Sequence, residues 1–327
     1  MTWADRSVLV TGATGLVGSW LCKHLVAEGA SVVALVADVD PRSELVRSGT
    51  LPQVTVVPGV LEDPDVVARV VIGRDVDTVF HLGAQTIVGA AHRDPVGTFE
   101  ANIRGTYLLL DACRRSGGRV GRVVVASSDK AYGPSDELPY QESTPLHGVQ
   151  PYEVSKSCTD LLAQSYAATY DLPVAIARCG NIYGGGDLNW SRIVPGTLRS
   201  LIRGETPVIR SDGTLVRDYL HVRDVVEAYL ALAAWLDTPG ASRSPGEMAF
   251  NFSNEEPRSV LEVYSAVCEA FGASVEPEVL GRASEEIPAQ HLDAGRARSV
   301  LGWKSSVPLS EGLAEAATWY RDLLAPR

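Results

Sequence analysis

Cysteines, long apolar runs and basic residues are all scarce in this sequence, and each shortage narrows what the protein can be. The 5 cysteines among 327 residues are odd in number and scattered, without the close pairs that metal ligation requires, so we expect reduced thiols and no metal site. The longest apolar window, VVEAYLALAAWL at 225–236, contains a Glu and is too short to span a bilayer. The first residues, MTWADRSVLVTG, lack the basic segment and apolar stretch of a targeting signal. The sequence therefore predicts a cytoplasmic protein with no membrane partner.

Positive charge is in the minority as well. The chain has 29 Lys and Arg against 40 Asp and Glu, which gives a formal charge of −11 without a dense run of one sign. A nucleic-acid partner is therefore not expected. Hydrophobic residues form 45% of the chain and charged residues 21%, so a chain of this length can bury one large core or two closely packed ones.

The order of apolar runs predicts the fold class. Strand-like runs alternate with helical patterns through the first half of the chain: SVLVTG, SVVALV, VTVV, DTVFHLG, RVVVASS and PVAIAR. This alternation is typical of an α/β fold with a doubly wound parallel sheet, the Rossmann arrangement. After about residue 180 the alternation stops, and short helices and Pro-containing loops follow. We expect residues 1–179, with a return segment at about 222–252, to form a nucleotide-binding domain, and 180–221 and 253–327 to form a smaller C-terminal α/β domain that binds a substrate.

A glycine-rich turn lies at the start of the chain. Gly12, Gly15 and Gly18 follow a predicted strand directly and lead into a helix, the context in which glycines bring backbone close to a dinucleotide pyrophosphate. A glycine triplet alone is also common in ordinary turns. An acidic residue about twenty positions later often binds the adenosine ribose, and Asp38, two residues after the strand end at Val36, is the candidate against a plain loop carboxylate. Because no Arg directly follows that strand, the sequence favours NAD over NADP.

A tyrosine and a lysine stand four residues apart in PYEVSK. On a helix, Tyr152 and Lys156 share one face. A nearby ammonium is expected to lower the pKa of the phenol, so that Tyr152 acts as a base toward a sugar hydroxyl. The alternative is an ordinary surface pair. Ser128, at the end of an earlier strand, favours the catalytic interpretation because its hydroxyl could bind the same substrate oxygen.

Six segments in this order, TGATGLVG, VFHLGAQ, SSDKAYG, PYEVSK, CGNIYGGGD and VRDYLHVRD, resemble extended short-chain dehydrogenases/reductases of the nucleotide-sugar epimerase and dehydratase branch. The similarity runs from about residue 6 to LGWK at 301–304. The resemblance implies that Ser128, Tyr152 and Lys156 form a catalytic triad around the nicotinamide of NAD. It also implies that Asn102 supports this triad from the neighbouring helix.

The two residues after the triad hydroxyl separate the reactions of this branch. Its epimerases tend to have small or neutral residues there, whereas its 4,6-dehydratases carry an acid followed by a base, most often Asp then Glu. Here Asp129 and Lys130 resemble the pair of CDP-glucose 4,6-dehydratases. A neutral Asp129 could protonate the departing 6-hydroxyl, and Lys130 could take the C5 proton if burial or nearby cations keep it partly uncharged, or stabilise an enolate if it stays charged. An ordinary ion pair at a strand end is the alternative.

The resemblance also implies two sets of binding residues. The cofactor set is Gly12, Gly15, Leu16, Val17, Gly18, Asp38, Leu61, Leu82, Ala84, Asn102, Tyr152, Lys156 and Cys179. The substrate set is Gln85, Thr86, Asn181, Arg192, Arg217 and Arg282, with Arg217 best matched to a phosphate contact. The acidic residue that often follows the third strand is absent, because Val60 and Leu61 stand there. We therefore expect a cofactor pocket held more by backbone and apolar contacts.

Together these features predict an NAD-dependent nucleotide-diphospho-hexose 4,6-dehydratase that makes a 4-keto-6-deoxy sugar. A nucleotide-sugar 4-epimerase is the alternative, and a non-catalytic NAD-binding scaffold is a third interpretation. The resemblance further implies a homodimer formed through the helices expected at 98–116 and 152–170.

Overall fold

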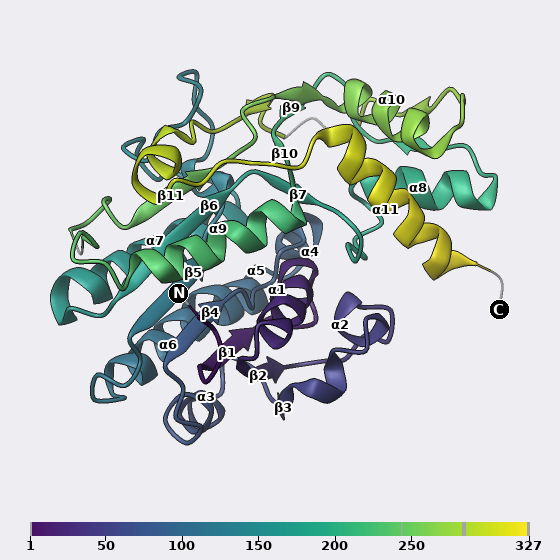
Figure 1. The fold of residues 1–327 in the computed structure, drawn as a ribbon. Helices are drawn as coiled ribbons and strands as arrows, with labels where there is room; N and C mark the ends of the chain where they lie inside the picture. Colours follow the sequence, from purple (N-terminus) through teal and green to yellow (C-terminus); the bar gives the residue numbers. More distant parts are fainter. Residues whose placement is uncertain (1, 243, 283–285, 326–327) are drawn as a thin grey trace.

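A seven-stranded parallel sheet forms the centre of the protein in the computed structural model, which describes residues 2–242, 244–282 and 286–325 (Figure 1). The strand order is β3-β2-β1-β4-β5-β6-β11. The strands are β1 (Ser7–Thr11), β2 (Ser31–Val36), β3 (Thr55–Pro58), β4 (Thr78–His81), β5 (Arg122–Ala126), β6 (Val174–Cys179) and β11 (Ala249–Phe252). An order that reverses beside β1 is that of doubly wound dinucleotide-binding sheets, so the predicted fold class is confirmed. The seventh strand, β11, is not among the runs that the sequence pattern singles out.

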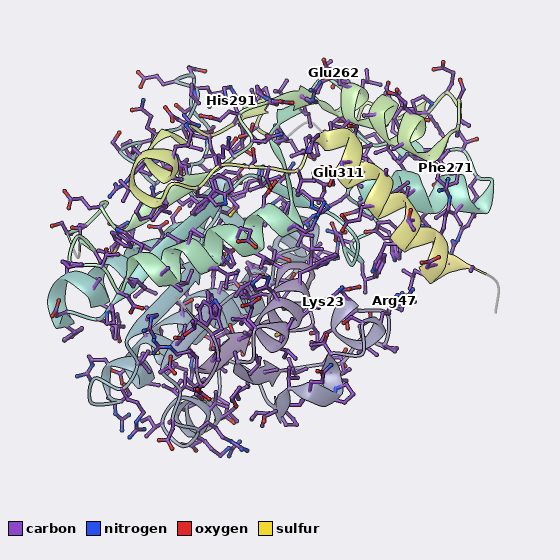
Figure 2. All side chains as sticks on the ribbon, in the orientation of Figure 1. Lys23, Arg47, Glu262, Phe271, His291 and Glu311 are labelled. Carbon is purple, nitrogen blue, oxygen red and sulfur yellow. The ribbon has the colours of Figure 1, made fainter. Side chains whose placement is uncertain are left out.

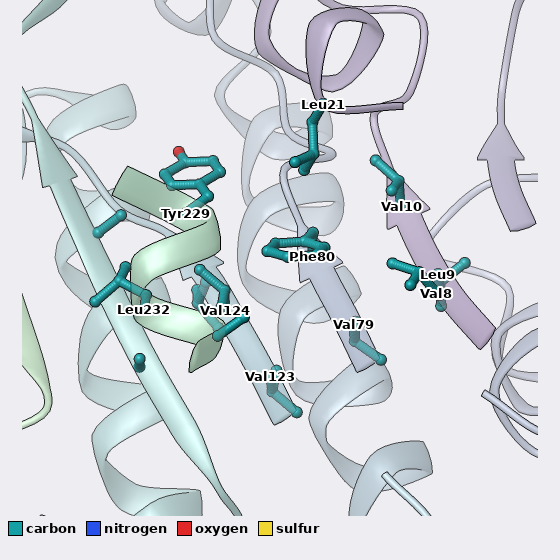
Figure 3. Packing of buried hydrophobic residues seen from close by; sticks show 14 of the residues in the cluster. Val8, Leu9, Val10, Leu21, Val79, Phe80, Val123, Val124, Tyr229 and Leu232 are labelled. Atoms are coloured by element: carbon teal, nitrogen blue, oxygen red, sulfur yellow. The ribbon is translucent and has the colours of Figure 1, made fainter. Parts of the chain in front are cut away.

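The inner strands form because they are short, nearly continuous runs of β-branched and other apolar residues that are buried on both faces. The edge strand β3 is mostly exposed. Figure 3 shows the packing on one face, where Phe80 and Val124 of the sheet meet Leu21 of α1 (Leu16–Ala27) and Tyr229 of α9 (Val222–Trp235). The carboxyl ends of the parallel strands all meet at one edge of the sheet.

Helices cover both faces of the sheet (Figure 1). On one face α1 packs against α9, and on the other α6 (Gly105–Arg114) packs between α3 (Pro64–Val71) and α7 (Pro151–Tyr170). Shorter elements connect them: α2 (Glu44–Arg47), η1 (Leu51–Gln53), α4 (Val88–Arg93), α5 (Pro95–Phe99), η2 (Glu100–Arg104) and η3 (Asp129–Tyr132). Among the described residues, no helix combines the length and the apolar character needed to cross a bilayer.

The helix expected at 98–116 is interrupted. The structure has α5, then a π-helical turn at η2, then α6. The carbonyl of Asn102 in that turn accepts from the hydroxyl of Thr106 at 2.5 Å and from that of Thr159 on α7 at 3.0 Å. Two side-chain hydroxyls thus bond to the backbone of this π turn, a kind of turn that is frequent at functional sites.

The rest of the chain forms a smaller part with its own apolar cluster. Its helices are α8 (Ile193–Arg203), α10 (Val260–Phe271), η4 (Ala297–Leu301) and α11 (Leu309–Leu324). Its short strands pair as β7 (Asn181–Tyr183) with β10 (Tyr219–His221), β8 (Val208–Ile209) with β13 (Glu278–Val279), and β9 (Val216–Arg217) with both β12 (Arg258–Ser259) and β14 (Ala289–Gln290). Its core contains Leu198, Val263, Val267, Leu313 and Tyr320.

The two parts touch near α1, α2 and α11. The indole of Trp20 donates to the carbonyl of Gly185 at 2.7 Å, and the indole of Trp319 donates to Glu44 at 2.7 Å. Figure 2 shows Lys23 and Arg47 on the α1 and α2 side of this contact, where Lys23 pairs with Glu44 and Arg47 stacks on Trp319. The domain boundaries at 179, 221 and 252 stay predictions.

Candidate active site

The glycine turn between β1 and α1 leaves no room for side chains. Gly12 has a left-handed φ of +69°, and a Cβ built there would lie 2.8 Å from the nitrogen of Gly83 at the end of β4. A Cβ on Gly18 would lie 2.1 Å from the carbonyl oxygen of Gly12. Gly15 is the N-cap of α1, and no described side chain caps its first N–H groups. This close-packed, uncapped helix start fits the pyrophosphate of a dinucleotide.

Other members of the predicted cofactor set lie beside this turn. Thr11 accepts from the backbone N–H groups of Leu82 and Gly83, at 3.1 and 2.9 Å, and so ties the end of β1 to the end of β4. The buried side chain of Leu61 fills the space that a Cβ on Gly83 or Gly105 would occupy. Asp38 is exposed, and its carbonyl accepts from the hydroxyl of Thr14 in the glycine turn at 3.2 Å. The structure thus brings the ends of β1, β2 and β4 together.

The turn after β5 carries the triad hydroxyl and the two distinguishing residues. Ser128 is the N-cap of η3: its hydroxyl accepts from the backbone N–H of Lys130 at 3.2 Å and donates to the carboxylate of Asp129 at 2.9 Å. Asp129 is only 3% exposed. The amine of Lys130 donates instead to the side-chain oxygen of Gln290 on β14. Asp129 and Lys130 therefore point to different partners, which disfavours a simple ion pair between them.

Tyr152 and Lys156 lie one turn apart on α7, and both are buried. The helix begins with a capping box in which Gln150 and Glu153 satisfy each other's backbone N–H groups, directly after a loop and with Pro151 at the first helical position. Lys156 donates to the carbonyl of Ala126 at the end of β5, at 2.8 Å. This bond anchors α7 to the strand that carries Ser128.

The electrostatics of this pair differ from the sequence expectation. Burial raises the pKa of Tyr152 to about 12, although the charge of Arg192 and a hydrogen bond with Ser128 act to lower it. Burial lowers the pKa of Lys156 to about 8. The predicted lowering of the phenol pKa by the Lys156 ammonium is therefore wrong here, because the amine is committed to a backbone carbonyl and both groups are desolvated.

Asn102 braces the triad helix without touching the triad. Its amide donates to the hydroxyl of Ser155 at 2.9 Å and exchanges two hydrogen bonds with the backbone of Gln85, at 2.7 and 3.0 Å. Ser155 stands between Tyr152 and Lys156, and its hydroxyl donates to the carbonyl of Tyr152. The supporting role predicted for Asn102 is thus compatible with its contacts, which link α7 to the loop of Gln85 and the exposed Thr86.

The predicted substrate arginines have different surroundings. Arg192, the N-cap of α8, pairs with Asp187 at 3.1 Å, and its charge acts on the phenol of Tyr152. Arg217 is buried, and its guanidinium donates to the carbonyls of Val216, Ile287 and Pro288 at 2.7, 2.6 and 3.3 Å. Arg282 is exposed and stands directly before the residues that the structure does not describe. Asn181 on β7 follows Cys179, which is buried at the end of β6.

Two residues near this site were not predicted. Asp218, whose pKa burial raises to about 6, accepts from the hydroxyl of Ser253 and the backbone N–H of Leu292. Its signal was present, because it belongs to the VRDYLHVRD segment. Gln290 gave no signal, since it lies in a two-residue strand beyond every recognised motif.

Comparisons with known proteins agree with this geometry. The model of the NAD dependent epimerase/dehydratase family matches residues 8–244. The chain is 29% identical to a CDP-glucose 4,6-dehydratase of Salmonella typhimurium, over 98% of this chain and 91% of that protein. It is 31% identical to a UDP-glucose 4-epimerase of Mycolicibacterium smegmatis, over 96% of this chain and 98% of that protein.

A solved structure shows the same likeness. A double mutant of the dTDP-glucose 4,6-dehydratase of Streptomyces venezuelae, with NAD bound, matches with a TM-score of 0.85 at 28% identity, covering 96% of this chain and 97% of that chain. Dehydratases and epimerases are therefore both among the similar proteins.

Proposed function

The chain belongs to the NAD dependent epimerase/dehydratase family, and from this premise we propose that it is a nucleotide-diphospho-hexose 4,6-dehydratase. The observation that carries the choice within the family is the turn after β5. An acid and an amine directly follow the hydroxyl of Ser128, and they bond to different partners, Asp129 to the half-buried Ser128 and Lys130 to the buried Gln290. A reaction that only oxidises and reduces C4 has no use for this second acid and base. A reaction that eliminates water across C5 and C6 needs both.

NAD, when bound, would supply the hydride acceptor for C4 of the sugar and the hydride donor for C6. The residues that would hold it are the uncapped turn of Gly12, Gly15 and Gly18, the exposed Asp38, and Lys156 beside the end of β5. Apolar contacts from Leu61 and Leu82 complete the pocket, as expected from the missing acidic residue after β3.

Tyr152 takes the proton of the 4-hydroxyl in this proposal. With a pKa of about 12, the phenol is protonated at neutral pH, so it acts as a base only when cations near it stabilise the phenolate. Arg192 already acts in that direction. Lys156, one helical turn away, is the second cation, and in this proposal its flexible side chain must exchange the bond to Ala126 before it can stabilise the phenolate. Ser128 holds the sugar oxygen that loses the proton.

Lys130 and Asp129 carry out the elimination. Once C4 is a ketone, the C5 hydrogen is acidic, and the uncharged amine of Lys130 accepts it as a proton. Asp129 donates a proton to the 6-hydroxyl, which leaves as water. C6 then receives the hydride and C5 regains a proton, so the product is a nucleotide-diphospho-4-keto-6-deoxyhexose. Burial lowers the pKa of Lys130, and Arg217 adds to this, which makes an uncharged amine accessible.

The substrate in this proposal is a nucleotide-diphosphate hexose, and the nucleotides in the names of the similar proteins are CDP, UDP and dTDP. Gln85, Thr86, Asn181, Arg192, Arg217 and Arg282 are the proposed contacts. Arg217 is the residue best suited to a diphosphate, but its guanidinium is bonded to backbone carbonyls at 216 and 287–288. Binding a diphosphate there requires that these bonds be exchanged.

Incubation with CDP-, dTDP-, UDP- and GDP-glucose in deuterated water tests the function. We expect one of them to give a product with the alkaline absorbance of a 4-keto sugar and a solvent deuteron at C5. The proposal fails if the product is the C4 epimer without C5 deuterium. That outcome would support the alternative, a 4-epimerase, to which the 31% identity to a UDP-glucose 4-epimerase also corresponds. Thermal shifts across the same panel identify the nucleotide, because a ligand that binds only the folded protein raises its melting temperature.

We also propose that the chain forms a cytoplasmic homodimer. Exposed apolar side chains gather on the helices expected to pair: Tyr107 on α6, and Leu161 and Tyr170 on α7, with Leu161 54% exposed. Helices that flank the sheet in this way can form a four-helix contact with a second copy. The five cysteines are unpaired thiols, which suits a reducing compartment. Sedimentation of wild type as a dimer and of Leu161→Glu as a monomer would support the pairing, and a monomeric wild type would contradict it.

A further inference from the structure

Gln290 is a fully buried amide that contacts the proposed C5 base. It lies on β14 with no exposed surface, and its side-chain oxygen accepts from the amine of Lys130. Lys130 belongs to the turn after β5, 160 positions earlier. This bond joins the catalytic turn of the large sheet to the small three-stranded sheet that contains Arg217.

A neighbouring hydroxyl favours one orientation of the Gln290 amide. The side chain of Gln290 acts to lower the pKa of Tyr140, although the Gln290 Nε2 makes no hydrogen bond among the described residues. That hydroxyl donates its only hydrogen to the carbonyl of Gly133 at 2.6 Å, so it presents lone pairs to the amide. Tyr140 also stacks on Tyr132 of the same turn, with ring centroids 4.9 Å apart. The NH₂ group therefore belongs on the Tyr140 side, and the oxygen on the Lys130 side.

The backbone on both sides of Gln290 is fixed. Before it, the backbone N–H of Val216 donates to the carbonyl of Pro288, and Gln290 is the register partner of Arg217 in the parallel pair β9–β14, contacts that do not depend on the Arg217 guanidinium. After it, the carbonyl of His291 accepts from the backbone N–H of Tyr140, and Leu292 donates to Asp218. Hydrogen bonds on both sides of Gln290 thus hold the backbone of this two-residue strand in place.

We propose that Gln290 is a positioning residue for proton abstraction at C5, a role that rests on the proposed dehydratase function. An uncharged Lys130 amine has two hydrogens and one lone pair. One of these hydrogens is donated in a hydrogen bond to the side-chain oxygen of Gln290, which holds the amine nitrogen in place. The lone pair stays available to accept the C5 proton. After the transfer the ammonium keeps the same bond. Because the acceptor is a neutral amide and not a carboxylate, it holds the amine without favouring the charged form strongly.

The charged groups around Lys130 agree with this role. Burial acts to lower its pKa, Asp129 acts to raise it, Arg217 acts to lower it, and Glu153 and Glu286 act to raise it. The net direction is downward, so burial and Arg217 together outweigh three carboxylates. A fourth carboxylate, placed in contact with the amine, would act against this balance.

Gln290→Glu and Gln290→Met test the proposal. For Gln290→Glu we expect the acid limb of the pH–rate profile to move up by about 1 pH unit or more, because a carboxylate in contact favours the ammonium. For Gln290→Met we expect deuterium exchange at C5 of the 4-keto product to fall about tenfold or more, while C4 oxidation persists. Exchange needs only the proton transfer, and the near-ultraviolet absorbance of reduced nicotinamide after mixing reports C4 oxidation separately.

Gln53→Glu is the matched control, since it adds the same charge on the exposed η1 turn. Gln290→Asn, which keeps an amide, is measured with the others, and thermal unfolding of every variant separates misfolding from misplacement. The inference is overturned if Gln290→Glu leaves the acid limb where wild type has it, or if C4 oxidation and C5 exchange fall together in a folded Gln290→Met or Gln290→Asn protein. A wild type that neither exchanges C5 nor forms a 4-keto sugar refutes the proposed function instead.

Discussion

Tyr152→Phe is expected to lose about a thousandfold in kcat, the size typical of a removed general base, while it binds NAD as wild type does. The phenol is buried against Ser128, and phenylalanine keeps the ring that fills this space. Only the hydroxyl that receives the substrate proton is lost. The folded state and the glycine turn, which lies on a different strand, should be unaffected.

Steady-state kinetics with the substrate found by the panel, and a fluorescence titration with NAD, measure the two quantities. Tyr170→Phe, on the exposed end of the same helix, is the control and should retain wild-type turnover. Full activity in Tyr152→Phe would refute the assigned role of the phenol. Loss of turnover with NAD binding intact would also exclude the third interpretation, a scaffold that binds NAD without catalysis.

Asp160→Asn is expected to lower the free energy of unfolding by about 3–5 kcal/mol, the cost of breaking a buried ion pair from one side. Arg178 and Asp160 are 1% and 0% exposed, and the guanidinium makes two bonds to the carboxylate, at 2.8 and 2.9 Å. Burial acts to lower the pKa of Arg178, but the hydrogen bonds and charge of Asp160 raise it above its usual value. The variant leaves this cation buried without a counter-charge.

Urea unfolding of wild type and variant gives the difference directly. The matched control is Asp111→Asn, which breaks a partly exposed pair with Arg114 on α6, and solvent screening should make its effect on the free energy of unfolding much smaller. A loss below about 1 kcal/mol in Asp160→Asn would show that the pair is dispensable. Because Arg178 also donates to the hydroxyl of Tyr132 in the η3 turn, we expect the folded variant to hold Asp129 and Lys130 less firmly.

The local parts of this molecule could be predicted from the sequence, because they depend on residues close together in the chain. The strand runs, the glycine turn and the spacing of Tyr152 and Lys156 each contain their own signal. So does the Asp129–Lys130 pair, since both residues follow a strand end. The π turn at η2 has no such signal, and the contacts of its Asn102 carbonyl include a hydroxyl from another helix, that of Thr159.

Burial and long-range contacts account for the rest. The pKa of Tyr152 could not be read from its spacing to Lys156, since desolvation decides it and the lysine amine is bonded to Ala126. The motif identified Arg217, but it did not predict that the guanidinium would donate to three backbone carbonyls. Gln290 meets Lys130 only because β14 pairs with β9, a contact with no counterpart in local sequence.

The π turn at Asn102 has a consequence for how this chain tolerates insertions and deletions. Removing one residue from 100–104 would restore unbroken α-helical periodicity from α5 through α6, and on propensity alone the helix should improve. The same deletion would remove the extra residue that the π turn accommodates, so side chains within 100–104 would shift around the helix axis by up to one residue position, about 100° in an α-helix. Asn102 could then no longer reach the backbone of Gln85 on one side and Ser155 on the other. We therefore expect insertions and deletions to be tolerated in the surface loops but not in the π turn. There the irregular helix lets the amide of Asn102 bond to Gln85 and to Ser155 at the same time.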